Sequence, residues 1–392
     1  HDWSIEATPH PDNPAQAGGG FFPGGIGWYR KQLEIPATLG DDHVLIEFDG
    51  VYMNSEVWCN GHFCGLRPYG YSSFCYDLTP YITPGEAATI AVRVDNSRQK
   101  NSRWYSGSGI YRHVWLTIAG PVRVDHWGTQ VTTPEVSDDL AIVECAVTVA
   151  SEECGTRNAE CGIEVCAELI DACSLRRQSV DSRSLRRQSV DSRSPRRQSV
   201  DSRSPRRQSV DSRSCRRQSV DLHLQAQATT GVETTAAFTI EVPNPRLWSP
   251  DTPHLYTLRI TLERDGEVLD TYDTRFGIRS LRFDANEGFF LNGQSLKMKG
   301  MNEHHDAGCL GAAVPDDVIR RRFRILKEMG CNAIRVAHNP ASPTFLDLCD
   351  EMGFMVVEDA FDEWRDGKTP FGYQLYWDQW WERDLVDMIH RD

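Results

Sequence analysis

The chain has 392 residues, and its hydrophobic content of 40% and aromatic content of 10% are enough to bury the cores of two or three domains. Its formal net charge of −14 excludes an ordinary nucleic-acid-binding protein, because contact with phosphates relies on clustered Lys and Arg. No stretch approaches the roughly 20 consecutive apolar residues of a membrane span, and the first residues lack the parts of a secretion signal, so no membrane partner is expected.

Twelve cysteines are spread along the chain, and none forms a Cys-x-x-Cys pair or another spacing typical of a zinc site. We interpret them as small buried or free thiols. Thiols in such number favour a reducing compartment, such as the cytoplasm, over an oxidising one. The sequence does not identify the compartment itself.

Short alternating apolar runs, broken by turns, fill residues 27–118. Asn60-Gly61 separates two of these runs, which is the typical signal of a tight β-hairpin. This region is therefore predicted to form an antiparallel β-sandwich. Similar runs continue from residue 122 to residue 276, apart from one interruption, and their number is typical of an immunoglobulin-like sandwich.

The interruption is a tandem repeat with a ten-residue period, in which variants of LRRQSVDSRS recur over residues 175–220. It holds 14 Arg and 4 Asp, so the rest of the chain carries a net charge of −24. The units have no aromatic and few apolar residues to offset chain entropy, which predicts a disordered loop between two strands. Arg-Arg-Gln-Ser also resembles substrates of basophilic protein kinases, and the alternative is an expanded repeat without a role.

The pattern changes after Phe276. A hairpin is predicted around Asn292-Gly293, followed by a strand, a helix that starts near Pro315 and stops at Gly330, and a second strand over 331–338. A second helix should start after Ser342 as N-cap and lead to a third, buried strand. This β-α-β-α-β order predicts parallel strands covered by helices. The apolar face of the first helix is expected to comprise Ile319, Phe323, Leu326 and Met329.

Polar side chains follow all three of these strands. They are Asn302 to Asp306 after the first, His338 and Asn339 after the second, and Glu358, Asp359, Asp362 and Glu363 after the third. Parallel α/β folds bind ligands at the carboxyl ends of their strands, so we expect this set to form a functional site.

Two kinds of site are disfavoured there. A metal site would need ligand spacings that are absent, and the neighbours His304 and His305 should point apart on an extended segment. No Gly-rich loop for phosphate follows any of the strands. A neutral, hydroxyl-rich ligand remains, and aromatic faces that pack on sugar rings would suit it. The candidates, which are equally well explained as core residues, are Trp104, Tyr105, Trp364, Trp377, Trp380 and Trp381.

Several segments resemble glycoside hydrolase family 2, the family of β-galactosidases and β-glucuronidases. The resemblance is carried by NAIRVAHNPASPTFLDLCDEMGFMVV, RWYSGSGIYRHVWL, NPRLWSPDTPHLYTL, FGIRS and FFLNGQSLKMKGMNEHHDAG. It implies a jelly-roll sugar-binding domain over 1–120, an immunoglobulin-like sandwich over 121–280 with the repeat inserted, and the first part of a (β/α)8 TIM barrel over 281–392. The fold class is thus multidomain β plus α/β.

The resemblance also implies a retaining hydrolase of terminal non-reducing β-glycosides that uses two glutamates as acid/base and nucleophile. In the family the acid/base follows an Asn at the end of the fourth barrel strand. This chain ends before such a pair, because Asn286-Glu287 and Asn302-Glu303 come too early. We therefore expect both catalytic glutamates beyond Asp392 and no hydrolase activity of the 392-residue chain itself.

The candidate substrate-binding residues combine the strand ends with the family motifs. They are His304, His338, Asn339, Asp359, Glu363, Trp364, Arg103, Trp104 and Asp306. By resemblance, His304 and His338 face the sugar, Glu363 lies near the acid/base, and Arg103 and Trp104 belong to a jelly-roll loop at the rim of the site. Arg365 replaces a metal-binding histidine of magnesium-dependent members, so no cofactor is expected, although magnesium is left open.

Three further questions stay open in the sequence. β-Galactosides are the expected substrates, with β-glucuronides as the alternative. A non-catalytic carbohydrate-binding protein or a kinase-regulated interaction loop is a different class of function. A homo-oligomer is left open as well.

Overall fold

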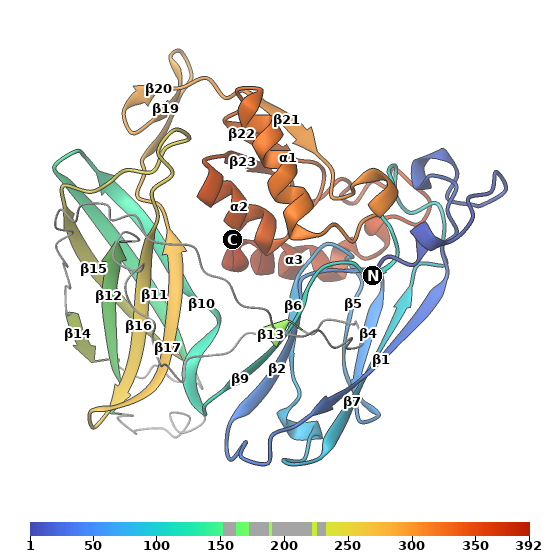
Figure 1. The fold of residues 1–392 in the computed structure, drawn as a ribbon, viewed down its shortest axis with the longest axis horizontal. Helices are drawn as coiled ribbons and strands as arrows, with labels where there is room; N and C mark the ends of the chain where they lie inside the picture. Colours follow the sequence, from blue (N-terminus) through green and yellow to red (C-terminus); the bar gives the residue numbers. More distant parts are fainter. Residues whose placement is uncertain (152–161, 172–187, 190–221, 226–232) are drawn as a thin grey trace, which may run out of the picture.

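A computed structural model describes residues 1–151, 162–171, 188–189, 222–225 and 233–392 (Figure 1). Two β-sandwiches lie side by side, and an α/β part that holds all three α-helices of the described residues lies across them (Figure 1). Of the predicted disordered segment 175–220, only residues 188–189 lie within the described chain, where they form a short strand. The rest of that prediction lies outside the described residues. Within them, no helix is long and apolar enough to cross a bilayer.

The first sandwich is a jelly roll that buries one face of each of its two main sheets. Its strands are β1 (Ile26–Glu34), β2 (His43–Phe48), β3 (Val51–Tyr52), β4 (Ser55–Cys59), β5 (His62–Arg67), β6 (Phe74–Asp77), β7 (Ala87–Asp95), β8 (Gly109–Ile110), β9 (Val114–Ala119) and β13 (Gln188–Ser189). The main sheets have the orders β1-β7-β4-β5 and β13-β9-β2-β6, and β3 pairs with β8. The Asn60-Gly61 hairpin is confirmed, since both residues have positive φ between β4 and β5.

The second sandwich is immunoglobulin-like, with sheet orders β10-β11-β15 and β14-β12-β16-β17. Its strands are β10 (Val122–Val136), β11 (Leu140–Ser151), β12 (Glu164–Asp171), β14 (Leu222–Gln225), β15 (Glu233–Pro243), β16 (Tyr256–Arg264) and β17 (Glu267–Phe276). Alternate residues such as Val143, Val165 and Leu258 are fully buried between the sheets, as the period-two pattern predicts.

The α/β part contains an antiparallel sheet, β18-β19-β20, and a parallel sheet, β21-β22-β23. The bounds are β18 (Leu281–Asp284), β19 (Gly288–Leu291), β20 (Gln294–Ser295), β21 (Gly300–Glu303), β22 (Ala333–Val336), β23 (Met355–Glu358), α1 (Asp316–Glu328), α2 (Pro343–Met352) and α3 (Trp377–Arg391). Ile334 and Val336 of β22 pack among the buried residues of α1 and α2. Because strand residues alternate, Arg335 points to the opposite face, toward the ends of the neighbouring strands.

The helix ends follow the sequence signals closely. The Ser342 hydroxyl accepts a hydrogen bond from the Phe345 amide at the start of α2, and Gly353 ends that helix in the left-handed conformation. The predicted apolar face of α1 is confirmed for Ile319, Phe323 and Leu326. It is wrong for Met329, which is 62% exposed because α1 ends one residue earlier and the chain turns away there.

A cluster of aromatic side chains joins the jelly roll to the α/β part. Its buried members include Tyr52, Tyr69, Tyr71 and Tyr111 from the first domain and Tyr373 and Trp377 from the last. The Tyr69 hydroxyl donates to the Ala360 carbonyl at 2.8 Å. This contact fixes the jelly roll over the carboxyl ends of the parallel strands, where the candidate site lies.

Candidate functional site

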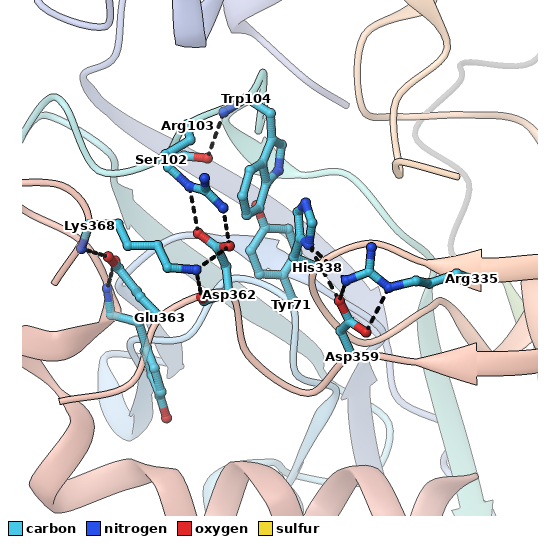
Figure 2. A network of polar contacts seen from close by, with 11 residues as sticks. Tyr71, Ser102, Arg103, Trp104, Arg335, His338, Asp359, Asp362, Glu363 and Lys368 are labelled. Atoms are coloured by element: carbon cyan, nitrogen blue, oxygen red, sulfur yellow. Dashed lines mark hydrogen bonds and ion pairs between the residues drawn. The ribbon is translucent and has the colours of Figure 1, made fainter. Parts of the chain in front are cut away.

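The site forms where the jelly-roll loop that carries Trp104 meets the end of β22 and the loop after β23 (Figure 2), next to the end of β21. The Trp104 ring lies 5.5 Å from the His304 ring and 5.2 Å from the His338 ring, measured between centroids. The two histidine rings are themselves 5.4 Å apart. Parallel strands end at one edge of the sheet, which is why residues 34 positions apart in the sequence meet here.

The Trp104 indole is held in place by the jelly roll itself. Its Nε1–H donates to the Tyr71 hydroxyl at 3.2 Å, and Tyr71 in turn belongs to the buried aromatic cluster. Trp104 is therefore a rigid wall of the site rather than a mobile surface side chain.

His304 and His305 point to different neighbours, as expected for adjacent residues on an extended segment. The His305 ring packs against Tyr71 and Tyr111 and places Nε2 3.2 Å from the Ser106 carbonyl oxygen. Burial lowers the pKa of His305 to about 4, so the ring is neutral at pH 7 and its Nε2–H donates to that carbonyl. His305 thus ties the domains together, whereas His304 faces Trp104.

An ion pair between the domains closes one side of the site (Figure 2). The Arg103 Nε and Nη2 atoms donate to Asp362 at 3.1 and 2.5 Å, a two-point contact, and Lys368 Nζ lies 3.1 Å from the same carboxylate. Burial opposes ionisation of Asp362, but the hydrogen bonds from Arg103 and Lys368 outweigh it and hold the pKa below its usual value. Asp362 is therefore an anion held between two cations.

A second charged group orients His338. Asp359 follows β23 and accepts hydrogen bonds from the Arg335 guanidinium. The His338 Nδ1 atom lies 3.3 Å from both Asp359 Oδ2 and Arg335 Nη2. Nδ1 therefore has a partner in both tautomers: with a proton it donates to Asp359, and without one it accepts from Arg335. The remaining ring nitrogen, Nε2, is left for another hydrogen bond.

Glu363 supports the loop that follows β23. It is only 6% exposed, and its two carboxylate oxygens accept the backbone N–H groups of Lys368 at 2.5 Å and Tyr373 at 2.7 Å. A Cβ atom at Gly372 would lie 1.4 Å from Glu363 Oε1, so only glycine fits beside this carboxylate. Glu363 therefore shapes the wall of the site by holding residues 364–373.

We expect Gly372→Ala to displace the Glu363 carboxylate and to release the backbone amides of Lys368 and Tyr373. Hydrogen exchange at these amides should accelerate by roughly tenfold or more, because each charge-assisted bond contributes about 1.5–3 kcal/mol. Gly120→Ala is the matched control, since its nearest non-neighbouring atom would lie 3.6 Å from the new Cβ. Unchanged exchange in Gly372→Ala would contradict this role of Glu363.

A cavity opens between these groups. Its lining comprises Tyr52, Met53, Tyr69, Gly70, Tyr71, Asn101, Ser102, Trp104, His338, Asp362, Glu363, Thr369 and Tyr373. It combines aromatic faces with neutral and charge-balanced polar groups, which suits a ligand rich in hydroxyls. No group of three or more His, Cys, Asp or Glu side chains in the described parts of the chain is arranged to hold a metal ion.

The structure gathers six of the nine predicted residues. Trp104, His338 and Glu363 line the cavity, while His304, Arg103 and Asp359 contact residues that line it. The other three lie outside it. Asn339 is buried and lines a separate hollow beside His304 and His305. Trp364 is 64% exposed and stacks on Trp377, and Asp306 accepts a hydrogen bond from Gly308 within its own loop.

Several residues of the site were missing from the predicted set, among them Tyr71, Tyr373 and Asp362 in the lining, and Lys368 and Arg335, which bind Asp362 and Asp359. Strand alternation could have indicated Arg335, and Asp362 stands among the carboxylates after β23. The tyrosines carry no such signal, because their place depends on how the jelly roll docks on the parallel sheet.

Family models match the chain in three consecutive regions. They are described as glycosyl hydrolases family 2, sugar binding domain, over residues 20–119; glycosyl hydrolases family 2 over 122–279; and glycosyl hydrolases family 2, TIM barrel domain, over 284–380. Together they cover most of the chain in the order of its three domains.

Individual relatives agree with these matches. The chain is 45% identical over 392 residues to a β-galactosidase of Bacteroides ovatus, BoGH2A, and covers 100% of itself and 41% of that protein. It is 26% identical over 366 residues to a β-glucuronidase of Bacteroides fragilis, covering 91% and 45%. A crystal structure of a glycosyl hydrolase family 2 member from Bacteroides cellulosilyticus matches with a TM-score of 0.83 and 35% identity, covering 100% and 45%. The chain thus spans less than half the length of these proteins.

Proposed function

Because the chain belongs to glycosyl hydrolase family 2, we propose that it forms the sugar-recognising part of an enzyme that hydrolyses terminal non-reducing β-glycosides, in the first place β-galactosides. The observation that carries this proposal is the cavity lined by Trp104, His338, Asp362 and Glu363, with His304 packed against Trp104 at its edge. An aromatic wall and neutral imidazoles can pack on a sugar ring and exchange hydrogen bonds with its hydroxyls. The relative from Bacteroides ovatus, described as a β-galactosidase, supports the choice of sugar.

The residues of this chain would bind and orient the sugar. Trp104 would contact the apolar face of the ring, and His338, oriented by Asp359, would present Nε2 to a hydroxyl. We propose that the two glutamates of the retaining mechanism, whose carboxyl groups stand about 5 Å apart, lie outside residues 1–392. The 392-residue chain would then recognise a sugar without cleaving it.

The charge balance of the site favours a neutral sugar over a glucuronate. Arg103 and Lys368 both engage Asp362, and Arg335 engages Asp359. The carboxylate of Glu363 also acts on Arg103, so three carboxylates face three cations and little positive charge is left to attract a sugar carboxylate. This charge distribution supports β-galactosides as substrates. β-Glucuronides are the alternative substrates, and the experiment must distinguish the two.

The test compares nitrophenyl β-galactoside with nitrophenyl β-glucuronide as substrates of a longer protein that contains this chain. We expect turnover of the galactoside, little turnover of the glucuronide, and none of either by the purified 392-residue chain. Faster cleavage of the glucuronide would overturn the sugar assignment. Sugar binding without any hydrolysis by the longer protein would favour a non-catalytic carbohydrate-binding protein.

In that longer protein, Trp104→Ala should raise KM about tenfold, which corresponds to about 1.4 kcal/mol of lost binding, and should change kcat less. The reason is that the indole would be a preformed wall for the sugar and would take no part in bond breaking. Phe283→Ala is the control, since this exposed aromatic residue lies on β18 and its ring contacts Phe289 instead. A KM equal to that of the control would contradict the role of Trp104.

A further inference from the structure

A row of three aromatic side chains, Trp28, Trp58 and Phe63, lies on the outer face of the jelly-roll sheet β1-β7-β4-β5. Along these strands, alternate residues such as Val57 and Val92 enter the core, so the residues between them face outward. Trp28 is 62% exposed and Phe63 is 54% exposed. In Figure 1 this sheet lies on the side of the jelly roll away from the immunoglobulin-like sandwich.

The three rings form one continuous surface. The Trp28 and Trp58 rings are 5.4 Å apart between centroids and inclined by 28°, and Phe63 follows Trp58 at 5.6 Å. Ala91 stands opposite Trp58 on the intervening strand β7, and its small side chain leaves room for the two indoles to meet above it. The row crosses from β1 to β5, which is three interstrand spacings or about 14 Å.

Three charged side chains beside the row are paired with one another. Arg93, which stands opposite Trp28 in the sheet, donates to Glu56 at 3.1 Å and to Asp95 at 2.8 Å. Arg30, which stands opposite Ala91 and faces outward from β1, brings the charges of this face to two cations and two carboxylates. These groups offer hydrogen-bond donors and acceptors to hydroxyls but carry little unbalanced charge to attract an ionic ligand. The surface is therefore apolar in the middle and polar, yet nearly neutral, along one side.

We propose that the aromatic row is a second carbohydrate-binding surface, which takes a neutral oligosaccharide of several units along the rings, separate from the cavity at Trp104. Sugar rings present C–H faces that pack on aromatic rings, and their hydroxyls can reach the paired charges at the side. A second copy of the chain fits less well. The exposed apolar side chains of this face are Ile26, Trp28, Phe63 and Leu66, with Trp58 half-buried between them, and the core of a stable homodimer interface is larger and more apolar than such a patch.

The experiment titrates the 392-residue chain with cellohexaose and xylohexaose, which have no terminal galactose for the Trp104 cavity, by isothermal titration calorimetry. At least one of these probes should bind, and Trp28→Ala and Trp58→Ala should each weaken that binding tenfold or more. Phe283→Ala, an exposed aromatic residue elsewhere, and Trp104→Ala, in the cavity, should leave it unchanged. Circular dichroism of each variant checks that the fold is kept, and Trp28→Phe should retain part of the affinity.

Three outcomes would overturn the proposal. The first is that no probe binds. The second is that binding survives Trp28→Ala but is lost in Trp104→Ala, which would place the sugar in the cavity. The third is that the chain sediments as an oligomer that Trp28→Ala dissociates, which would assign the aromatic row to self-association. A longer protein that fails to hydrolyse glycosides would contradict the proposed function but would leave these three outcomes unchanged.

Discussion

Replacing Arg67 with alanine is expected to lower the free energy of unfolding by about 3–5 kcal/mol. Arg67 is 1% exposed and carries its charge from β5 into the contact with α3, where Nη2 lies 2.8 Å from Asp384 and 2.5 Å from Asp387. Burial raises the pKa of Asp384, although Arg67 counteracts this rise. Without the guanidinium, the fully buried carboxylate of Asp384 would no longer be paired with a cation. The free-energy cost of burying this charge would remain, and the folded state would lose stability.

Urea unfolding followed by tryptophan fluorescence provides the measurement, because the Arg67 guanidinium lies 5.6 Å from the Trp380 ring. Arg93→Ala is the matched control, as it breaks a partly exposed pair with Glu56 that should contribute only about 0–1 kcal/mol. The double variant Arg67→Met with Asp384→Leu should recover much of the loss, since both charges are then removed. Equal unfolding midpoints for Arg67→Ala and Arg93→Ala would refute the expectation.

Local features of the fold could be predicted because their causes lie within a few residues. Asn60-Gly61 and Asn292-Gly293 supply the positive φ that tight hairpins need, and Ser342 caps a helix three residues away. The alternation of strands and helices after residue 300 fixed the parallel sheet and thus the edge at which its polar residues gather. His304 and His338 meet for this reason.

The rest of the site depends on contacts across hundreds of residues. Arg103 pairs with Asp362, 259 positions away, and no local sequence pattern predicts such a pair. The structural role of Glu363 could not be predicted either. In the sequence, a carboxylate that accepts two backbone N–H groups cannot be distinguished from any other carboxylate near a strand end. Domain docking, rather than secondary structure, decides which polar residues reach the cavity.

Arg112 holds the jelly roll against the turn that carries His338. Arg112→Lys is therefore expected to loosen this turn. Arg112 Nη1 donates to the carbonyls of Tyr71 at 3.0 Å and Ala341 at 3.1 Å, and Nη2 donates to that of Pro340 at 2.6 Å. The guanidinium therefore links the jelly roll to the turn after β22. Lysine keeps the charge but cannot reach these carbonyls as a planar fork, so a loss of about 2–3 kcal/mol is expected.

Two measurements separate this positioning role from a general loss of stability. Hydrogen exchange at the Ala341 amide, which donates to Glu358, should accelerate in Arg112→Lys at a urea concentration where the chain stays folded. In a longer, active protein the same variant should raise KM about tenfold, because the His338 ring would no longer be held against Trp104. Arg282→Lys, at an exposed pair with Asp284 and Glu287, is the control. If both variants exchange and bind alike, Arg112 only joins the domains and does not position the site.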